Sequence, residues 1–279
     1  MLISAVLTLR PLQQSTLSAD QGRAIYGLFL SWIRQADSGL AQELHDIEGV
    51  KPFTVSGLLG LGQAVRGEVN LDPDHPLWWR VTTLTPRLSQ VVLEQILPNL
   101  PDRLTLADQP FQVIGATVDG AEHPWAGQTS YEELAQRHLL GAEEPSPWLN
   151  LEFATPTTFR SEGKHLPFPL PGLVFDHWLN KWNRFAPLSL HPDVKRFAEE
   201  CLAVSRYQLR SRVVRFGPAT FIGFVGRCSF RALRRDPYWL RLLHTLAGYA
   251  FYCGTGHKTT MGLGQTRVQN VGNESTRNE

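Results

Sequence analysis

The first third of the chain changes its hydrophobic period from that of a strand to that of a helix. Apolar side chains alternate along residues 3–9, as in a half-buried β-strand, and recur at helical spacing along residues 25–33. Ser18 and Gln21 have the spacing of a capping box, which predicts the start of this helix. A strand followed by an amphipathic helix is therefore expected here.

The next hundred residues complete one recognisable unit. Strands are predicted at 52–61 and 77–86, a short helix at 87–97 and a further strand at 111–120. The resulting order, β-α-β-β-α-β, is that of the ferredoxin-like unit, in which two helices cover one face of a four-stranded antiparallel sheet.

The same order begins again after a short helix predicted at 130–140. The later elements are a strand at 148–159, a helix at 174–185, two strands at 207–215 and 220–233 joined through Gly217-Pro218, a helix at 240–251 and a closing strand at 264–271. We therefore predict an α+β protein of two tandem ferredoxin-like domains, residues 1–145 and 146–279, with a glycine-rich loop near the carboxyl end.

The composition of the chain limits its expected cellular location and the cofactors it is expected to bind. No run of eighteen apolar residues and no signal-peptide pattern occurs in the sequence, which favours a cytoplasmic protein without membrane contact. The chain has 3 cysteines, at spacings that match no zinc or redox motif, so free thiols are expected. The nine histidines form no paired ligands at helical spacing, and we expect neither a metal site nor a cofactor.

The net charge of +1 conceals two halves of opposite sign. Residues 1–150 carry 9 Lys and Arg against 17 Asp and Glu, whereas residues 151–279 carry 18 against 9. Such asymmetry indicates a polyanion, nucleic acid above all, as the partner of the basic half. The alternative is that the charges only solvate the two surfaces.

The stretch "GTGHKTTMGLGQ", residues 254–265, poses the sharpest question. Lys258-Thr259 resembles the end of a Walker A motif, but His257 and Tyr252 stand where that motif has its two glycines. A nucleotide site is therefore disfavoured. The remaining interpretations are a turn built on glycines with positive φ, and a loop whose N–H groups approach a phosphate backbone.

Three blocks of the sequence resemble a known family. They are "LHDIEGVKPFTVSGL", "TPTTFRSEGKHLPFPLPGLVFDHWLNKWNRFAP", and the tail comprising "GFVGRCSFRAL" and "LLHTLAGYAFYCGTGHKTTMGLGQTR". Together they are similar to the CRISPR-associated endoribonucleases that process precursor CRISPR RNA, members of the RAMP superfamily. The resemblance implies two ferredoxin-like domains, binding of CRISPR repeat RNA, and metal-independent cleavage by attack of a 2′-hydroxyl on the adjacent phosphate.

That resemblance also implies a catalytic site in the first domain. The reaction needs proton transfer, which suits histidine, and positive charge on the phosphate, which suits lysine. His45 and Lys51 have the spacing of the family's catalytic pair, and Tyr26 lies about one turn before the place of a third helper. A histidine ending a helix is otherwise a dipole partner or packing residue, and His165, His191 and His257 are rival candidates.

The basic half offers the residues expected to hold RNA. They are Arg160, Lys164, Arg210, Arg212, Arg227, Arg231 and, in the glycine loop, Gly254, Gly256, His257, Lys258, Gly262 and Gly264. Arginines spaced two apart on one strand share a face and could follow an RNA stem through its phosphates. An exposed charged ribbon is the alternative. The expected partners are repeat RNA and subunits of a CRISPR effector complex, with the chain a monomer or homodimer; a non-catalytic RNA-binding subunit is the alternative function.

Overall fold

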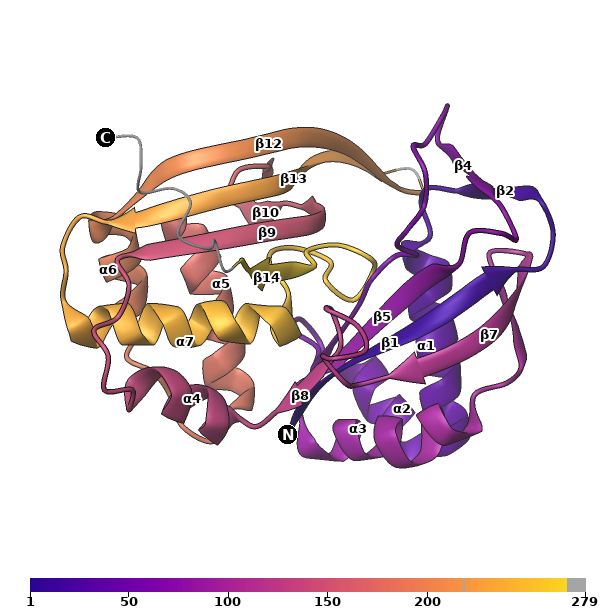
Figure 1. Cartoon of the computed structure of the whole chain (residues 1–279), viewed down its shortest axis with the longest axis horizontal. Coiled ribbons are helices and arrows are strands. Elements are labelled where there is room, and N and C mark those ends of the chain that lie inside the picture. Colours follow the sequence, from indigo (N-terminus) through magenta and orange to yellow (C-terminus); the bar gives the residue numbers. More distant parts are fainter. Residues whose placement is uncertain (218, 270–279) are drawn as a thin grey trace. The chain divides into compact units, whose positions relative to one another are not determined.

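The chain divides into two compact units in the computed structural model, which describes residues 1–217 and 219–269 (Figure 1). Unit 1 contains Met1–Ser130 and two short segments, Val214–Thr220 and Lys258–Leu263. Unit 2 contains the rest of the described chain, beginning at Tyr131. The two segments that join unit 1 from the far end of the sequence include half of the glycine loop, which a simple division of the chain into two consecutive domains does not anticipate.

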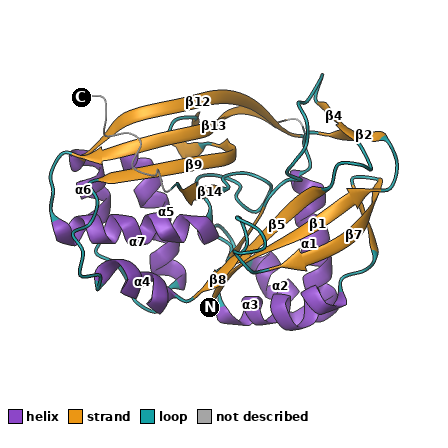
Figure 2. Ribbon diagram, viewed as in Figure 1, coloured by secondary structure: helices purple, strands orange, loops and turns teal. Residues whose placement is uncertain are grey.

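Unit 1 is built on an antiparallel sheet of order β3-β5-β1-β7-β6, with β8 also pairing with β1. Helices lie on one face of this sheet (Figure 2). The strands are β1 (Leu2–Pro11), β3 (Phe53–Val55), β5 (Leu77–Thr83), β6 (Arg103–Leu106), β7 (Gln109–Thr117) and β8 (Gly127–Thr129); β2 (Ser15–Ser18) and β4 (Glu68–Leu71) form a separate pair. The inner order β3-β5-β1-β7 is that of a ferredoxin-like unit, so this part of the fold prediction is confirmed.

Three helices accompany this sheet, namely α1 (Gly22–Ala36), α2 (Ser38–Asp46) and α3 (Pro86–Val91), the last continued by a π-helical turn, Val92–Ile96, and a 3-10 turn, Leu97–Asn99. The apolar stripe of α1 is the reason it packs on the sheet. Ile25, Phe29 and Ile33 are at most 1% exposed and belong to the core of this unit. The ring of Phe29 lies 5.1 Å from that of Phe53 on β3.

Unit 2 repeats the arrangement with an antiparallel sheet of order β12-β13-β9-β14. Its strands are β9 (Trp148–Thr157), β10 (Phe159–Ser161), β11 (Lys164–Leu166), β12 (Leu202–Phe216), β13 (Ala219–Ala232) and β14 (Thr266–Val268), with β10 and β11 forming a small hairpin. Its helices are α4 (Tyr131–Leu139), α5 (Pro171–Phe185), α6 (Val194–Cys201) and α7 (Pro237–Cys253). The second ferredoxin-like unit is thus confirmed as well.

The helix α4 belongs to unit 2, although the predicted boundary at residue 145 placed it in the first domain. It packs against α7, where the hydroxyl oxygens of Tyr131 and Tyr249 lie 3.3 Å apart and both rings contact Trp182 of α5 edge-on. This aromatic contact joins residues more than a hundred positions apart. Hydrophobic periodicity within α4 alone could not show with which of the two units this helix packs.

One local prediction is wrong, and several short elements were missed. The capping box is wrong: the side chain of Gln21 donates to the carbonyl of Ser18 (3.1 Å) and accepts from the N–H of Leu58 (3.0 Å), a tertiary contact that replaces the cap. Several elements were not predicted because each is short, namely α2, α6, β2, β4, β6, β8 and β11. Pro218 of the predicted turn and residues 270–271 of the predicted closing strand lie outside the described residues.

Candidate functional site

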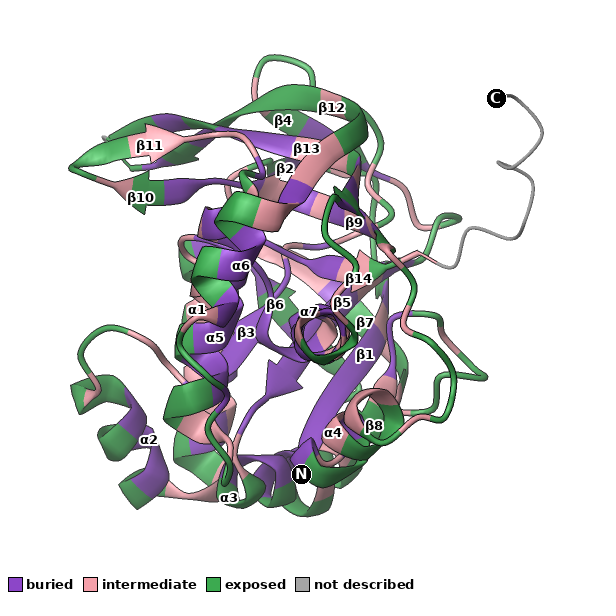
Figure 3. Ribbon diagram, turned by 90° about the vertical axis from the view of Figure 1, so that its left-hand side faces the viewer, coloured by how far each residue is buried: buried purple, intermediate pink, exposed green. Residues whose placement is uncertain are grey.

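His45 lies in the last turn of α2 and not beyond a single long first helix. Asp37 begins α2 by accepting a hydrogen bond from the N–H of Leu40 (2.8 Å), and Leu40, Ala41 and Leu44 are the buried side of the helix (Figure 3). The imidazole of His45 projects from the other side, with 70% of the side chain exposed. Its Nδ1 lies 3.2 Å from Oδ1 of Asp46. A carboxylate at this distance orients an imidazole and leaves Nε2 toward solvent.

Lys51 closes the carboxyl end of the same helix. Its ammonium donates to the carbonyl oxygens of Leu44, His45 (3.3 Å) and Ile47 (3.0 Å). The last carbonyls of a helix have no intrahelical partner and carry partial negative charge, so a cation is stabilised there. Burial lowers the pKa of Lys51, and the carboxylate of Asp46 opposes that shift. The predicted pair is therefore physically linked, since Lys51 holds the backbone that carries His45.

Tyr26, the third predicted catalytic residue, packs against the core of unit 1. Its ring lies on α1, stacked on Phe53 with centroids 6.0 Å apart. Burial raises the pKa of the Tyr26 hydroxyl above its ordinary value of 10.0, which makes the loss of its proton harder. The packing gives Tyr26 a structural task, which is to support β3 directly after the His45–Lys51 loop.

One half of the glycine loop is paired with β3, next to that loop. The N–H of Val55 donates to the carbonyl of Thr259 (3.1 Å), and the N–H of Gly262 donates to the carbonyl of Val55 (3.0 Å). Lys258 has φ 57°, and its ammonium lies 4.9 Å from the ring centre of Phe216. Segments from both ends of the sequence therefore meet beside Lys51 within unit 1.

The other half of the glycine loop is packed within unit 2. Gly256 has φ 80°, and a Cβ there would collide with the carbonyl of Thr158. The N–H groups of Gly254, His257 and Gly264 donate to the carbonyls of Ala250 (2.9 Å), Thr158 (2.8 Å) and Pro156 (3.1 Å) respectively. With that of Gly262, these N–H groups hold protein backbone, so binding a phosphate through them would require breaking main-chain hydrogen bonds. The glycines are needed for close backbone packing.

The predicted arginines and lysine are mostly exposed. Arg160 and Lys164 lie on the β10–β11 hairpin, and Arg210 and Arg212 lie on β12, the edge strand of its sheet. From residue 201 to residue 235 the sequence contains eight arginines and no Asp or Glu. Arg227 and Arg231 lie on β13 and share a face of the sheet, as expected. The β12–β13 ribbon is therefore strongly cationic.

The rival histidines differ in their surroundings. His191 is exposed: its Nδ1 accepts from the N–H of Asp193 (3.1 Å), and its ring lies edge-on to Trp239. His165 stacks in parallel on Phe221 (4.4 Å) and lies 5.7 Å from His257. All three histidines belong to unit 2, whereas the His45–Lys51 loop belongs to unit 1.

Two polar residues beneath the glycine loop were missed from the sequence. Trp178 donates through Nε1 to the hydroxyl of Thr255 (2.9 Å), and Lys181 donates to the carbonyl of Cys253 (2.5 Å). Burial lowers the pKa of Lys181 to about 8. The available signal was that Lys181 lies on the apolar stripe of α5, between two buried tryptophans. A charged residue on a buried stripe indicates a specific partner.

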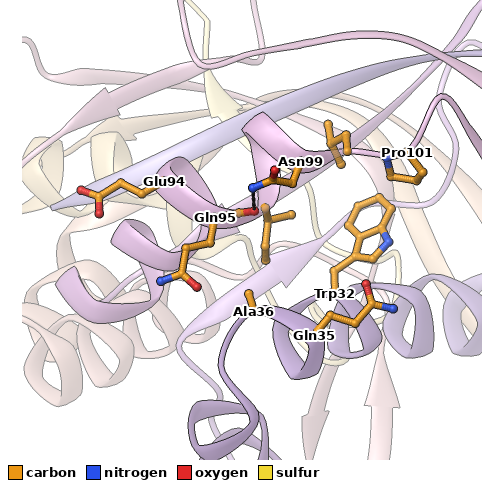
Figure 4. Close-up of a pocket in the computed structure, with 9 residues that line it drawn as sticks. Trp32, Gln35, Ala36, Glu94, Gln95, Asn99 and Pro101 are labelled. Atoms are coloured by element: carbon orange, nitrogen blue, oxygen red, sulfur yellow. Dashed lines mark hydrogen bonds between the residues drawn. The ribbon is translucent and has the colours of Figure 1, made fainter.

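A surface pocket of unit 1 lies elsewhere (Figure 4). It has a volume of about 600 Å³ and is lined by Trp32 and Gln35 of α1 and by Glu94, Gln95 and Asn99 of the turns after α3. None of the predicted site residues lines it. Among residues 1–217 and 219–269, no group of three or more His, Cys, Asp or Glu side chains is arranged to hold a metal ion. Nor does any helix in that part of the chain have the length and apolarity to cross a membrane.

Comparison with known proteins first defines the class. A solved RAMP protein described as binding different RNA substrates has a TM-score of 0.62 at 11% identity and covers 96% of this chain and all of its own, which shows a shared fold of two ferredoxin-like units. A Cas6 product complex has a TM-score of 0.78 at 29% identity, covering 96% of this chain and 99% of the other. Thermus thermophilus Cas6 has a TM-score of 0.72 at 25% identity, covering 96% and 98%.

Sequence comparisons then give the family. Residues 1–136 match the CRISPR Cas6 N-terminal domain, and residues 151–266 match CRISPR-associated endoribonuclease Cas6. The CRISPR-associated endoribonuclease Cas6 of Mycobacterium tuberculosis strain CDC 1551 is 30% identical over 267 residues, 93% of this chain and 74% of that protein. Its Streptococcus thermophilus counterpart is 25% identical over 145 residues, half of this chain and 58% of that protein. The chain belongs to the CRISPR-associated endoribonuclease Cas6 family.

Proposed function

We propose that this protein cuts the repeat sequences of precursor CRISPR RNA, and that the His45–Lys51 loop carries the chemistry. The observation that supports this most is an exposed imidazole on a helix end that a lysine side chain fixes by three hydrogen bonds. The loop lies in the segment that matches the family's amino-terminal domain. Binding of CRISPR repeat RNA is the corresponding partner assignment, and the product complexes of relatives support it.

In the proposed reaction the RNA supplies its own nucleophile. The 2′-oxygen loses its proton and forms a bond to the adjacent phosphorus, while the bond from phosphorus to the 5′-oxygen breaks. The leaving oxygen takes up a proton, so the products carry a 2′,3′-cyclic phosphate and a 5′-hydroxyl. An imidazole can carry out each proton transfer in this reaction, and no metal is required. His45 is the residue proposed to move it.

Lys51 contributes in two ways to this proposal. Its contacts with the carbonyls of Leu44 and Ile47 keep the His45 turn in place, and its positive charge lies within the loop where negative charge develops on the phosphate. To contact the phosphate directly, the ammonium of Lys51 would have to give up one of its hydrogen bonds to these carbonyl oxygens. Tyr26 is proposed to act by supporting Phe53 at the start of β3.

The RNA-binding surface is proposed to be the cationic side of unit 2. Arg160, Lys164, Arg210 and Arg212 are exposed and positioned to contact phosphates, and His257 and Lys258 of the glycine loop are proposed as further contacts. Because the N–H groups of Gly254, Gly262 and Gly264 are used by the protein, the side chains of neighbouring residues provide the proposed contacts. Cytoplasmic location, effector-complex partners and a monomeric or homodimeric state remain proposals of the same kind.

His45→Ala tests the proposal, with His75→Ala as a matched control. His75 is also an exposed histidine of unit 1, 77% exposed, with Nδ1 2.8 Å from an Asp72 oxygen. Under single-turnover conditions we expect His45→Ala to reduce cleavage by about 10²-fold or more, with RNA affinity unchanged within a few-fold, and His75→Ala to cleave normally. Normal cleavage by His45→Ala would refute the site.

Two further measurements address the mechanism. A 2′-deoxy substitution at the cut nucleotide should stop cleavage, and end-group analysis should find a cyclic phosphate and a 5′-hydroxyl. Cleavage should continue in EDTA, and full inhibition would contradict the metal-free route. If the wild-type protein binds repeat RNA but leaves it intact, the second candidate function applies, a non-catalytic subunit that holds repeat RNA.

A further inference from the structure

Within the described residues, the sheet of unit 2 has helices on one face only (Figure 2), and the side chains of its other face differ from those of an ordinary solvated face. Leu149 and Leu151 of β9 and Phe230 of β13 point to the helical side and are at most 1% exposed. The outward positions that alternate with them form cross-strand rows. We call these residues the sheet-face cluster: Trp148, Asn150, Glu152, Arg227, Arg231 and Arg267.

The first row pairs an aromatic ring with a guanidinium group. Trp148 and Arg231 are register partners on β9 and β13, and the guanidinium carbon lies 5.2 Å from the centre of the indole ring. This cation–π contact holds the indole in a defined orientation. Trp148 nevertheless remains 41% exposed. A fixed and partly exposed indole is a surface on which a planar ring can stack.

The second row presents an oriented amide. The hydroxyl of Ser229 donates to Oδ1 of Asn150 (2.7 Å), and the backbone carbonyl of Asn150 accepts from the N–H of Gln269 (2.8 Å). Because the oxygen of the Asn150 side chain is engaged by Ser229, its NH₂ group is directed elsewhere. Among the described residues it has no acceptor, so it is available as a hydrogen-bond donor next to the indole.

The third row carries an excess of positive charge. Arg227 and Arg267 are the register partners of Glu152 from either side, and Nε of Arg267 lies 2.6 Å from a Glu152 oxygen. That same oxygen also accepts from Gln269 (2.8 Å), so it has two partners within the protein. With Arg231, the cluster holds three guanidinium groups against one carboxylate. An anion is the complementary partner for such a surface.

We propose that the sheet-face cluster binds an unpaired nucleotide of RNA. The base stacks on Trp148, its edge accepts a hydrogen bond from Asn150, and its phosphate contacts Arg227. A duplex does not fit this role, because its bases are already stacked and their faces are covered, whereas single strands are bound by aromatic rings and arginines on open sheets. The inference rests on the proposed RNA-processing function and adds recognition of unpaired RNA to it.

The test measures binding of a fluorescein-labelled, unstructured oligoadenylate of about eight nucleotides. Fluorescence anisotropy is compared for the wild-type chain, Trp148→Ala, Trp148→Phe and Tyr238→Ala. Tyr238 is the matched control, an aromatic residue of the same unit that is 56% exposed but lies on α7. We expect Trp148→Ala to weaken binding about fivefold or more, Trp148→Phe to restore most of it, and Tyr238→Ala to change nothing.

Photocrosslinking gives an independent readout. A 4-thiouridine oligonucleotide should crosslink to peptides containing Trp148 or Asn150. Absence of oligonucleotide binding by the wild type, binding by Trp148→Ala within twofold of wild type, or crosslinks confined to other segments would each overturn the inference. Cleavage of repeat RNA by the wild type is measured separately. Normal cleavage with a failed binding test overturns only this inference, whereas absent cleavage with Trp148-dependent binding overturns only the nuclease proposal.

Discussion

Replacing Lys51 by methionine separates the two roles proposed for this residue. Methionine keeps an unbranched side chain of similar reach but removes the ammonium group, so the carbonyls of Leu44, His45 and Ile47 lose their common donor. The end of α2 is then left with unsatisfied carbonyls beside water. The substitution therefore perturbs the scaffold of the His45 turn while leaving His45 itself intact.

The expected magnitude follows from the contacts. A cation at a helix carboxyl end is worth about 0.3–1 kcal/mol, and a hydrogen bond to a charged group is worth about 1.5–3 kcal/mol before the cost of desolvation. The lowered pKa of Lys51 shows that burial offsets part of this gain. The released carbonyls regain water because the turn is near the surface. We therefore expect the free energy of unfolding to fall by about 1–2 kcal/mol.

Urea unfolding and hydrogen exchange measure the effect, and repeat-RNA cleavage is assayed beside them. Exchange should accelerate in the residues of α2, cleavage should slow, and RNA affinity should change only a few-fold. Lys195→Met is the control: Lys195 makes a single surface contact with Asp176 at 3.5 Å, and its loss should cost less than about 0.5 kcal/mol. A large loss of RNA affinity with unchanged stability would refute this reasoning, since Lys51 would then act on the phosphate directly.

Three other predictions concern packing, pH and RNA contacts. Gly256→Ala should destabilise unit 2 by about 2–4 kcal/mol, because φ is 80° and the new Cβ meets a backbone carbonyl; thermal unfolding measures it. Burial, with His244 nearby, lowers the pKa of His138 from 6.5 to about 4. The stabilising contribution of neutral His138 is therefore present above pH 6.5 and is lost as the pH falls toward 4. In urea unfolding measured at several pH values, His138→Gln should reduce this dependence of the free energy of unfolding on pH. Arg210→Gln with Arg212→Gln should lower the salt dependence of RNA binding by about one unit of slope per lost phosphate contact, and an unchanged slope would contradict that contact.

Hydrophobic periodicity along the sequence predicted much of the fold. The helical stripe of α1 identifies the side chains that face the core, because burial of apolar surface drives the packing. The period of two along β1 identifies Ile3 and Leu7 correctly, but Ser4 and Val6 on the opposite face of the strand are buried as well. The two β-α-β-β-α-β orders follow from such periods. Short elements such as α2 were not predicted, because a half-exposed helix of nine residues gives a weak periodic signal.

The sequence by itself determined the order of the principal strands and helices of the two ferredoxin-like units, the opposite charges of the two halves, and, through three sequence blocks, the family. Tertiary structure alone decided the partner of each polar group. It placed the ammonium of Lys51 on helix carbonyls, used the N–H groups of Gly254 and Gly264 for main-chain packing, and paired the glycine loop with β3 through Val55. The reason is physical: hydrophobic period depends on neighbours along the chain, whereas a hydrogen bond depends on which distant atoms the completed fold brings within reach.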